Sequence, residues 1–112
     1  MTARSRPPTP PKHLQDAGRA LWRGVLRDYE VSDHHDLARL QAAAEASDRI
    51  VEARKAVERD GAYVEGRFGL KAHPGLAVER DARTQLLRAL RELGVDLATA
   101  APTRPPSRWR GS

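Results

Sequence analysis

The sequence contains no cysteine. This absence excludes a disulfide framework and any metal site built on thiolate ligands, and it fits a protein of a reducing compartment. No apolar run approaches the roughly 20 residues that a membrane-spanning helix needs, and residues 1–13 lack the apolar segment of a secretory signal. We therefore expect a cytoplasmic protein with no membrane partner.

Proline is almost absent from the middle of the chain. Seven of the eight prolines lie in two end segments that are poor in large apolar residues: Pro7, Pro8, Pro10, Pro11, Pro102, Pro105 and Pro106. Burial in such segments cannot offset the entropy lost on ordering them. The pattern predicts a disordered basic arm over residues 1–13, a folded domain over residues 14–97 and a disordered basic tail over residues 98–112.

Aromatic residues are also scarce and make up only 4% of the chain. A domain of this size buries only about 60–65% of its unfolded surface, and its apolar residues are mainly alanine, leucine and valine. Such a core is thin. Oligomerisation is a usual remedy, and we expect a homo-oligomer.

Acidic residues are missing from both ends of the chain. All fifteen lie between Asp16 and Asp96, where fourteen lysines and arginines nearly balance them. The ends therefore carry the surplus positive charge, on Arg4, Arg6, Lys12, Arg104, Arg108 and Arg110. A neutral body with basic arms suits a polyanionic partner or an acidic groove on another protein. Alternatively, the basic ends only keep a small domain soluble.

Apolar periodicity predicts a mainly α fold with three helices, a long central helix and a short β-hairpin before the last helix. The first helix spans about residues 14–29, with its apolar residues on one side. The second runs from about His34 to Asp60, and Gly61 suits a left-handed cap. Its expected inward stripe is Leu37, Leu40, Ala44, Ser47, Ile50, Val51, Arg54 and Val57.

The hairpin is expected where Tyr63 and Val64 favour a strand and Gly66 and Gly69 bracket a tight turn. A two-stranded hairpin is marginal alone, so it must lie on the helices or pair with a neighbouring subunit. Pro74 suits the first turn of the third helix, which stops at Gly94. Its expected buried stripe is Val78, Ala82, Leu86, Ala89, Leu90 and Leu93, with Leu76 on the flank.

No catalytic constellation is visible. The glycine pair Gly66 and Gly69 lacks the Lys-Ser/Thr of a phosphate-binding loop, and no serine has a glycine elbow. The run Asp33-His34-His35-Asp36 offers nitrogen and oxygen ligands, but consecutive residues at a helix start point in different directions. Ser32 or Asp33 is better read as a solvated helix cap. We expect no enzyme activity, no cofactor and no metal.

The basic helix faces are the better functional signal. On the first helix, Arg19, Arg23 and Arg27 recur every four residues opposite the apolar stripe, and Lys12 would continue the row. Cations about 6 Å apart can lie along a phosphate backbone and release counterions. The third helix adds Arg80, Arg88 and Arg91 on its outer side. We predict that these seven residues bind DNA; the competing interpretation is ordinary solvated arginine.

The two tryptophans lie in different contexts. Trp22 lies beside the apolar stripe of the first helix, which favours a core position or a subunit contact. Trp109 stands between Arg108 and Arg110 in the tail, a composition typical of a binding hot spot or a base-stacking peptide. An incidental tail residue is the alternative.

Three stretches together make the chain resemble the phage terminase small subunit family over about residues 10–97. They are Gly18-Arg-Ala-Leu-Trp22-Arg with Leu26 and Tyr29, then Val57-Glu-Arg-Asp-Gly61 with the hairpin, and Lys71-Ala-His-Pro74-Gly-Leu-Ala-Val-Glu79-Arg-Asp-Ala82-Arg ending in Arg91-Glu-Leu-Gly94. The family usually has Asn before that proline, whereas this chain has His73.

The resemblance implies a non-catalytic, ring-forming subunit in the host cytoplasm that binds double-stranded viral DNA and delivers it to the terminase large subunit, which holds the ATPase and nuclease. It places Trp22, Tyr63, Val64 and Phe68 in subunit contacts. The tail residues Arg104, Arg108, Trp109 and Arg110 would dock on the large subunit or add DNA affinity. The alternatives are a helical prophage transcriptional regulator, which a dimer on palindromic DNA would support, and a protein-only assembly adaptor.

Overall fold

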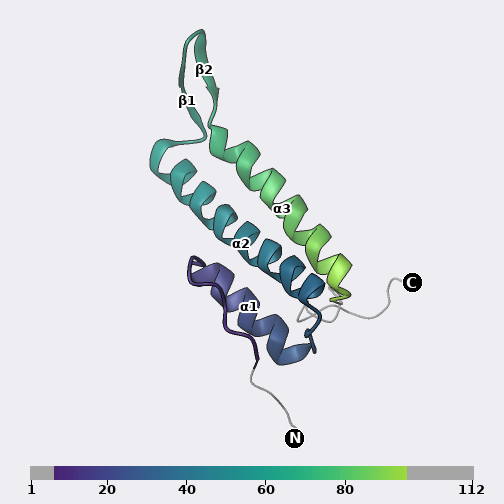
Figure 1. The fold of residues 1–112 in the computed structure, drawn as a ribbon. Coiled ribbons are helices and arrows are strands. Elements are labelled where there is room, and N and C mark those ends of the chain that lie inside the picture. Colours follow the sequence, from purple (N-terminus) through teal and green to yellow (C-terminus); the bar gives the residue numbers. More distant parts are fainter. Residues whose placement is uncertain (1–6, 96–112) are drawn as a thin grey trace, which may run out of the picture.

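The computed structural model describes residues 7–95. It confirms the mainly α architecture, in which a two-stranded hairpin separates the second and third helices (Figure 1). The elements are α1 (Asp16–Asp28), α2 (His34–Asp60), β1 (Tyr63–Gly66), β2 (Gly69–Ala72) and α3 (Pro74–Leu93). No helix within residues 7–95 is long and apolar enough to cross a bilayer.

The helix α2 is the centre of the molecule, and α1 and α3 pack against different sides of it (Figure 1). The chain reverses through the hairpin, so α3 runs antiparallel to α2. Two ion pairs mark this register: Arg54 with Glu79 at 3.0 Å near the hairpin, and Arg39 with Glu92 at 3.6 Å near the other end. The shorter α1 covers only the first part of α2, so the later turns of α2 are covered by α3 alone.

The core is built largely from small side chains. Its main cluster joins all three helices and consists of Leu14, Trp22, Val25, Leu40, Ala43, Ala44, Ala89 and Leu90. A smaller cluster of Ala46, Ile50 and Ala82 holds α2 to α3 further along. Alanines on the faces of α2 let both neighbouring helices approach closely, which matches the thin core expected from the composition.

Two of the expected apolar stripes are partly wrong. On α2, Val51 is 36% exposed and Arg54 is exposed, whereas Ala53 and Asp48 are buried. A single stripe is the wrong template because α2 has two helical partners and therefore buries two different sides. On α3, Val78 belongs to the expected buried stripe but is 45% exposed.

The helices α1 and α2 approach each other closely at Gly18 and Asp48. No side chain of α1 caps its own N-terminus; instead the buried Asp48 carboxylate accepts from the backbone N–H groups of Gln15 and Gly18, each at 2.7 Å. A side chain at Gly18 has no room, since an added Cβ would lie 2.5 Å from Asp48 Oδ2 and 2.8 Å from the Ala44 carbonyl. Asp48 is thus a cap for α1 supplied by a different helix.

Residues 7–13, which belong to the segment predicted to be a basic arm, contact α1 and α2 in the structure. The Trp22 indole Nε1–H donates to the Pro8 carbonyl at 3.0 Å, and Leu14 is only 1% exposed. His13 contacts Glu45 of α2 at 2.7 Å. Hydrogen bonds from Gln41 and His13 hold the pKa of Glu45 below its ordinary value. An indole N–H entering the core needs an acceptor, and the proline segment supplies it.

The remaining caps follow the local sequence closely. Asp33 Oδ1 accepts from the His35 N–H at 2.9 Å and so caps α2. Gly94 ends α3 with φ of 82° and ψ of 16°, the expected left-handed conformation. Gly61 has a positive φ of 88°, but its ψ of 156° lies outside the left-handed helical region, so the cap expected there is a different glycine turn.

Candidate nucleic-acid interface

The cationic row on α1 forms one continuous surface with the segment before the helix. Arg23 and Arg27 are exposed on its outer side, and Arg27 has only a 3.3 Å contact with its neighbour Asp28. The half-buried Arg19 donates to the Lys12 carbonyl at 3.2 Å, which brings these two predicted residues together. Arg23 makes no ion pair within residues 7–95, so its charge is free for an anionic partner.

The α3 arginines differ in how far other groups engage them. Arg80 lies 3.3 Å from its neighbour Asp81, whereas Arg88 and Arg91 are exposed and form no ion pair in the described part of the chain. Arg83 is engaged within the fold, because it and Arg54 both donate hydrogen bonds to Glu79.

Glu79 therefore links α2 to α3 through its carboxylate. The hydrogen bonds from Arg83 and then Arg54 hold the pKa of Glu79 below its ordinary value. These two arginines are partly neutralised, which separates them from the exposed Arg88 and Arg91.

The seven predicted DNA-binding residues do not form one surface. The α1 row and the α3 set lie on the outer sides of two helices that pack on different sides of α2 (Figure 1). Helix geometry places each outer side opposite the buried stripe. The two sets therefore belong to two separate helix surfaces of the chain.

Two further arginines that the sequence did not single out lie close to Arg88. A shallow groove of about 220 Å³ between α2 and α3 is lined by Arg39, Arg49 and Arg88 together with Glu45 and Glu92. Antiparallel packing of helices far apart in the chain creates this group, so no local sequence signal marks it.

The outer side of α3 also carries an uncovered apolar ridge. Leu76 is 39% exposed and Leu87 is 40% exposed. They lie along an open groove of about 380 Å³ that Arg80, Arg83 and Thr84 also line. The sequence placed Leu76 on the flank of the buried stripe and did not identify Leu87. Leu76 and Leu87 lie three turns apart on one side of α3 and form a partly exposed apolar strip there.

The β-hairpin does not lie on the helices. It extends past the ends of α2 and α3 (Figure 1), and none of its strand residues is buried. Tyr63 is 68% exposed, Phe68 93% and Leu70 71%. Of the two arrangements expected for a marginal hairpin, packing on the chain's own helices is absent within residues 7–95. Tyr63, Val64 and Phe68 therefore stand available to a partner.

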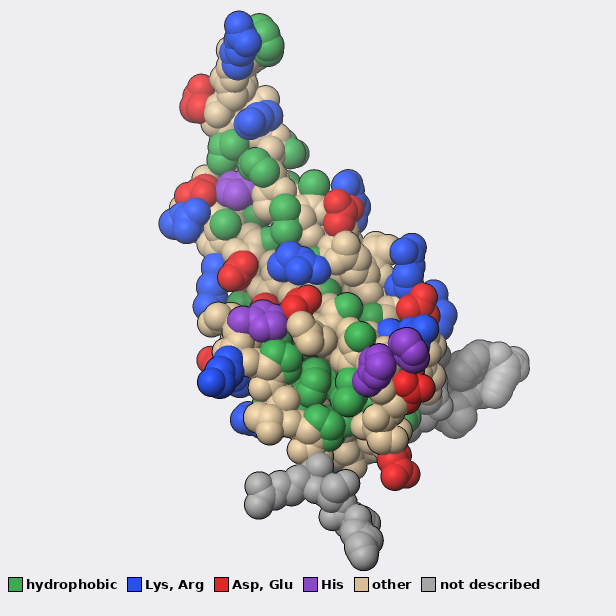
Figure 2. Space-filling model, in the orientation of Figure 1, with side chains coloured by type: hydrophobic (Ala, Val, Ile, Leu, Met, Phe, Trp, Pro, Cys, Tyr) green, Lys and Arg blue, Asp and Glu red, His purple; other side chains and the backbone are tan. Residues whose placement is uncertain are grey.

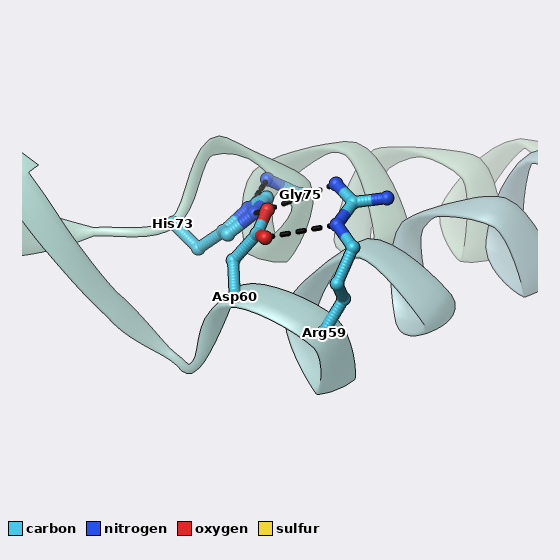
Figure 3. Close-up of polar contacts among 4 residues, drawn as sticks. All are labelled: Arg59, Asp60, His73 and Gly75. Carbon is cyan, nitrogen blue, oxygen red and sulfur yellow. Dashed lines mark hydrogen bonds and ion pairs between the residues drawn. The ribbon is translucent and has the colours of Figure 1, made fainter.

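The junction between the hairpin and α3 is closed by His73 (Figure 3). Its Nδ1 accepts from the Gly75 N–H at 2.8 Å, so the imidazole caps α3 in place of the usual asparagine. Because Nδ1 accepts, the neutral ring carries its proton on Nε2, and Nε2–H donates to Asp60 Oδ2 at 2.9 Å. Asp60 also accepts two hydrogen bonds from Arg59.

These contacts favour the charged form of the Asp60 carboxylate. The hydrogen bonds from Arg59 first and His73 second hold the pKa of Asp60 well below its ordinary value. A carboxyl group whose pKa is lowered by folding stabilises the folded state at pH values above its ordinary pKa, near 4. This stabilisation is lost as the pH falls below that value. The junction is thus intact at neutral pH.

Replacing His73 by alanine is expected to lower the free energy of unfolding by about 1 kcal/mol, because the α3 cap is lost. Replacing it by asparagine should retain most of that stability, since the amide oxygen accepts from the same N–H. Urea denaturation at one protein concentration measures both. His34→Ala, an exposed histidine at the start of α2, is the matched control. Equal stability of the His73→Ala and His34→Ala variants would contradict the capping role.

The acidic and histidine run at the start of α2 is engaged in other contacts. Asp33 caps the helix, Asp36 pairs with Arg39 at 3.0 Å, and the rings of His34 and His35 lie 4.6 Å apart between centroids. No group of three or more histidine or acidic side chains within residues 7–95 is arranged to hold a metal ion. The partner-binding residues predicted in the tail, Arg104, Arg108, Trp109 and Arg110, lie outside the described residues.

Comparison with known proteins adds one finding. A family model described as phage terminase, small subunit, matches residues 18–106, which is most of the chain. No curated protein and no solved structure matches the chain. The match begins in the first turn of α1, includes α2, the hairpin and α3, and extends into the basic tail.

Proposed function

Because the chain belongs to the phage terminase small subunit family, we propose that it is the DNA-recognition subunit of a phage packaging motor. In this role it assembles into a homo-oligomeric ring, binds double-stranded viral DNA and delivers that DNA to the large subunit. Members of the family are generally non-catalytic, and the ATPase and nuclease belong to the large subunit.

The DNA-binding proposal rests on three arginines that are exposed and unpaired in the described chain. Arg23, Arg88 and Arg91 are exposed and make no ion pair within residues 7–95. Most other arginines of the described chain are engaged by a carboxylate. Unpaired guanidinium groups on helix surfaces suit phosphate oxygens, because binding them releases counterions from DNA.

The separation of the two arginine faces also fits an assembly. In a closed ring every subunit presents the same faces in the same orientation. A duplex bound to such a ring can touch the α1 arginines of one subunit and the α3 arginines of another, and repetition strengthens a weak patch through multivalency.

Subunit contacts are proposed for the α3 ridge of Leu76 and Leu87 and for the base of the hairpin at Tyr63 and Val64. These side chains are apolar or aromatic, and all of them are at least partly exposed. Trp22 is only 4% exposed within its own core, so its place in the structure favours the core alternative over a direct subunit contact. The tail Arg104, Arg108, Trp109 and Arg110 is proposed to dock on the large subunit or add DNA affinity.

The proposal predicts two salt-dependent losses of duplex affinity. In Arg23→Ala/Arg27→Ala and in Arg88→Ala/Arg91→Ala, each lost phosphate contact should reduce the slope of log K against log salt by about one. Fluorescence anisotropy with a labelled duplex at several salt concentrations measures this slope. Lys55→Ala, an exposed α2 cation without an ion pair in the described structure, is the control.

The outcomes separate the parts of the proposal. If neither double variant differs from Lys55→Ala, the arginine assignment is wrong. If the wild type fails to bind duplex DNA even at low salt, direct DNA recognition is wrong, and an adaptor that docks on protein replaces it. Light scattering of the wild type tests the ring: a discrete assembly larger than a dimer supports it, and a dimer supports the regulator alternative.

A further inference from the structure

The tip of the hairpin is the most exposed apolar point of the described chain. Phe68 is 93% exposed, and the Arg67 guanidinium carbon lies 5.3 Å from the centroid of its ring. Basic and apolar side chains meet at this far end of the molecule, away from the core (Figure 2). An exposed aromatic ring beside a guanidinium group suits a ligand that offers both an apolar surface and negative charge.

The strand register places positive charge along one face of the hairpin. Val64 lies opposite Lys71, whereas Glu65 lies opposite Leu70. Because directly opposed residues share a face and successive residues alternate, Lys71 and Glu65 point to opposite faces. The stem of Lys71 packs over Gly66, where an added Cβ would lie 3.0 Å from its Cδ. Lys71 makes no ion pair within residues 7–95, so the face that it shares with Val64 is cationic.

The dimensions of the hairpin match a DNA groove. Strands of four residues extend about 13 Å at 3.3 Å per residue. The major groove is about 8.5 Å deep and admits a two-stranded ribbon. The helices do not obstruct this entry, because the hairpin projects past α2 and α3 (Figure 1).

We propose that the β1–β2 hairpin is a second DNA-contacting element whose tip enters a groove of the duplex. Arg67 and Lys71 contact phosphates on the groove walls, and Phe68 wedges against a base step and partly unstacks it. Minor-groove proteins insert apolar wedges between base steps and kink the duplex in this way, and β-ribbon proteins place their strands in either groove. The inference rests on the proposed function only in taking duplex DNA as the ligand. It assigns Phe68 to DNA instead of to a neighbouring subunit.

The test uses the full chain and a duplex of about 30 base pairs with 2-aminopurine beside one flexible TA step. Binding of the wild type should raise 2-aminopurine fluorescence through unstacking and bring dyes at the duplex ends closer together through bending. Phe68→Ala should abolish both signals and lower affinity roughly tenfold, the size of one lost stacking contact. Phe68→Trp should restore them.

Leu70→Ala is the matched control, since Leu70 is an exposed apolar residue of the same hairpin. It should leave affinity and both fluorescence signals unchanged. If Phe68→Ala behaves like Leu70→Ala on DNA while the Arg88→Ala/Arg91→Ala variant loses affinity, the hairpin inference is wrong and the proposed function stands. If Phe68→Ala lowers the mass of the assembly and leaves DNA bending intact, Phe68 is a subunit contact. A wild type that binds no duplex overturns both proposals.

Discussion

Replacing Asp48 by alanine is expected to lower the free energy of unfolding by about 2–4 kcal/mol, a large share of the stability of a small domain. The side chain is only 8% exposed, and it accepts from two backbone N–H groups at the start of α1. Alanine leaves both donors without their partner and removes the negative charge near the N-terminus of the helix. Urea denaturation followed by circular dichroism, at one fixed protein concentration, measures the loss.

Glu52→Ala is the control for Asp48→Ala, because Glu52 is an acid one turn further along α2 and is exposed. It should change the free energy of unfolding by less than about 0.5 kcal/mol. Asp48→Asn keeps one acceptor oxygen and should fall between the two. A second variant, Gly18→Ala, should also destabilise, since its Cβ would collide with Asp48 and the Ala44 carbonyl. Equal stability of Asp48→Ala and Glu52→Ala would show that Asp48 does not hold α1.

The elements could be predicted from the sequence because their signals are local. Asp33 caps α2, Pro74 opens α3, Gly94 closes it, and the glycines at 66 and 69 bracket the hairpin turn. Each of these depends on a few neighbouring residues, so the chain alone carries the information.

Long-range packing could not be predicted in the same way. The role of Asp48 depends on α1 lying across α2, and in the sequence it is one acid among fifteen in a balanced segment. The composition of residues 7–13 suggests disorder, whereas long-range contacts hold the segment: Trp22 donates to the Pro8 carbonyl and His13 contacts Glu45. Val51 fits a single apolar stripe on α2, but it is exposed because α2 buries two different sides, one against α1 and one against α3.

The candidate site shows the same division between local and long-range information. Periodicity correctly places Arg23 and Arg91 on exposed helix surfaces. It cannot say that their helices pack on different sides of α2, nor that Arg49 comes to lie beside Arg88. The sequence therefore indicates which helix faces carry arginines, whereas the fold decides which of these arginines are paired and which lie close together.

The double substitution Leu76→Glu/Leu87→Glu is expected to dissociate the assembly. If the α3 ridge packs against a second subunit, two carboxylates must be desolvated there, at a cost of several kcal/mol. The assembled fraction should fall roughly tenfold or more. The isolated fold should survive because both side chains are partly exposed, and the new glutamates lie four residues from Arg80 and Arg91 at favourable helical spacing.

Light scattering and circular dichroism on the same samples separate assembly from folding. Val78→Glu is the matched control: Val78 is an exposed apolar residue of α3, and a position two residues from Leu76 points about 160° away around the helix. It should leave the mass unchanged. Loss of mass in both variants would place the contact all around α3, and an unchanged mass in the double variant would exclude the ridge as the subunit interface. If only the double variant loses mass, the ridge is the subunit interface. Arg80, which lines the same groove, would then lie at a subunit boundary, where neighbouring chains can contact the same DNA.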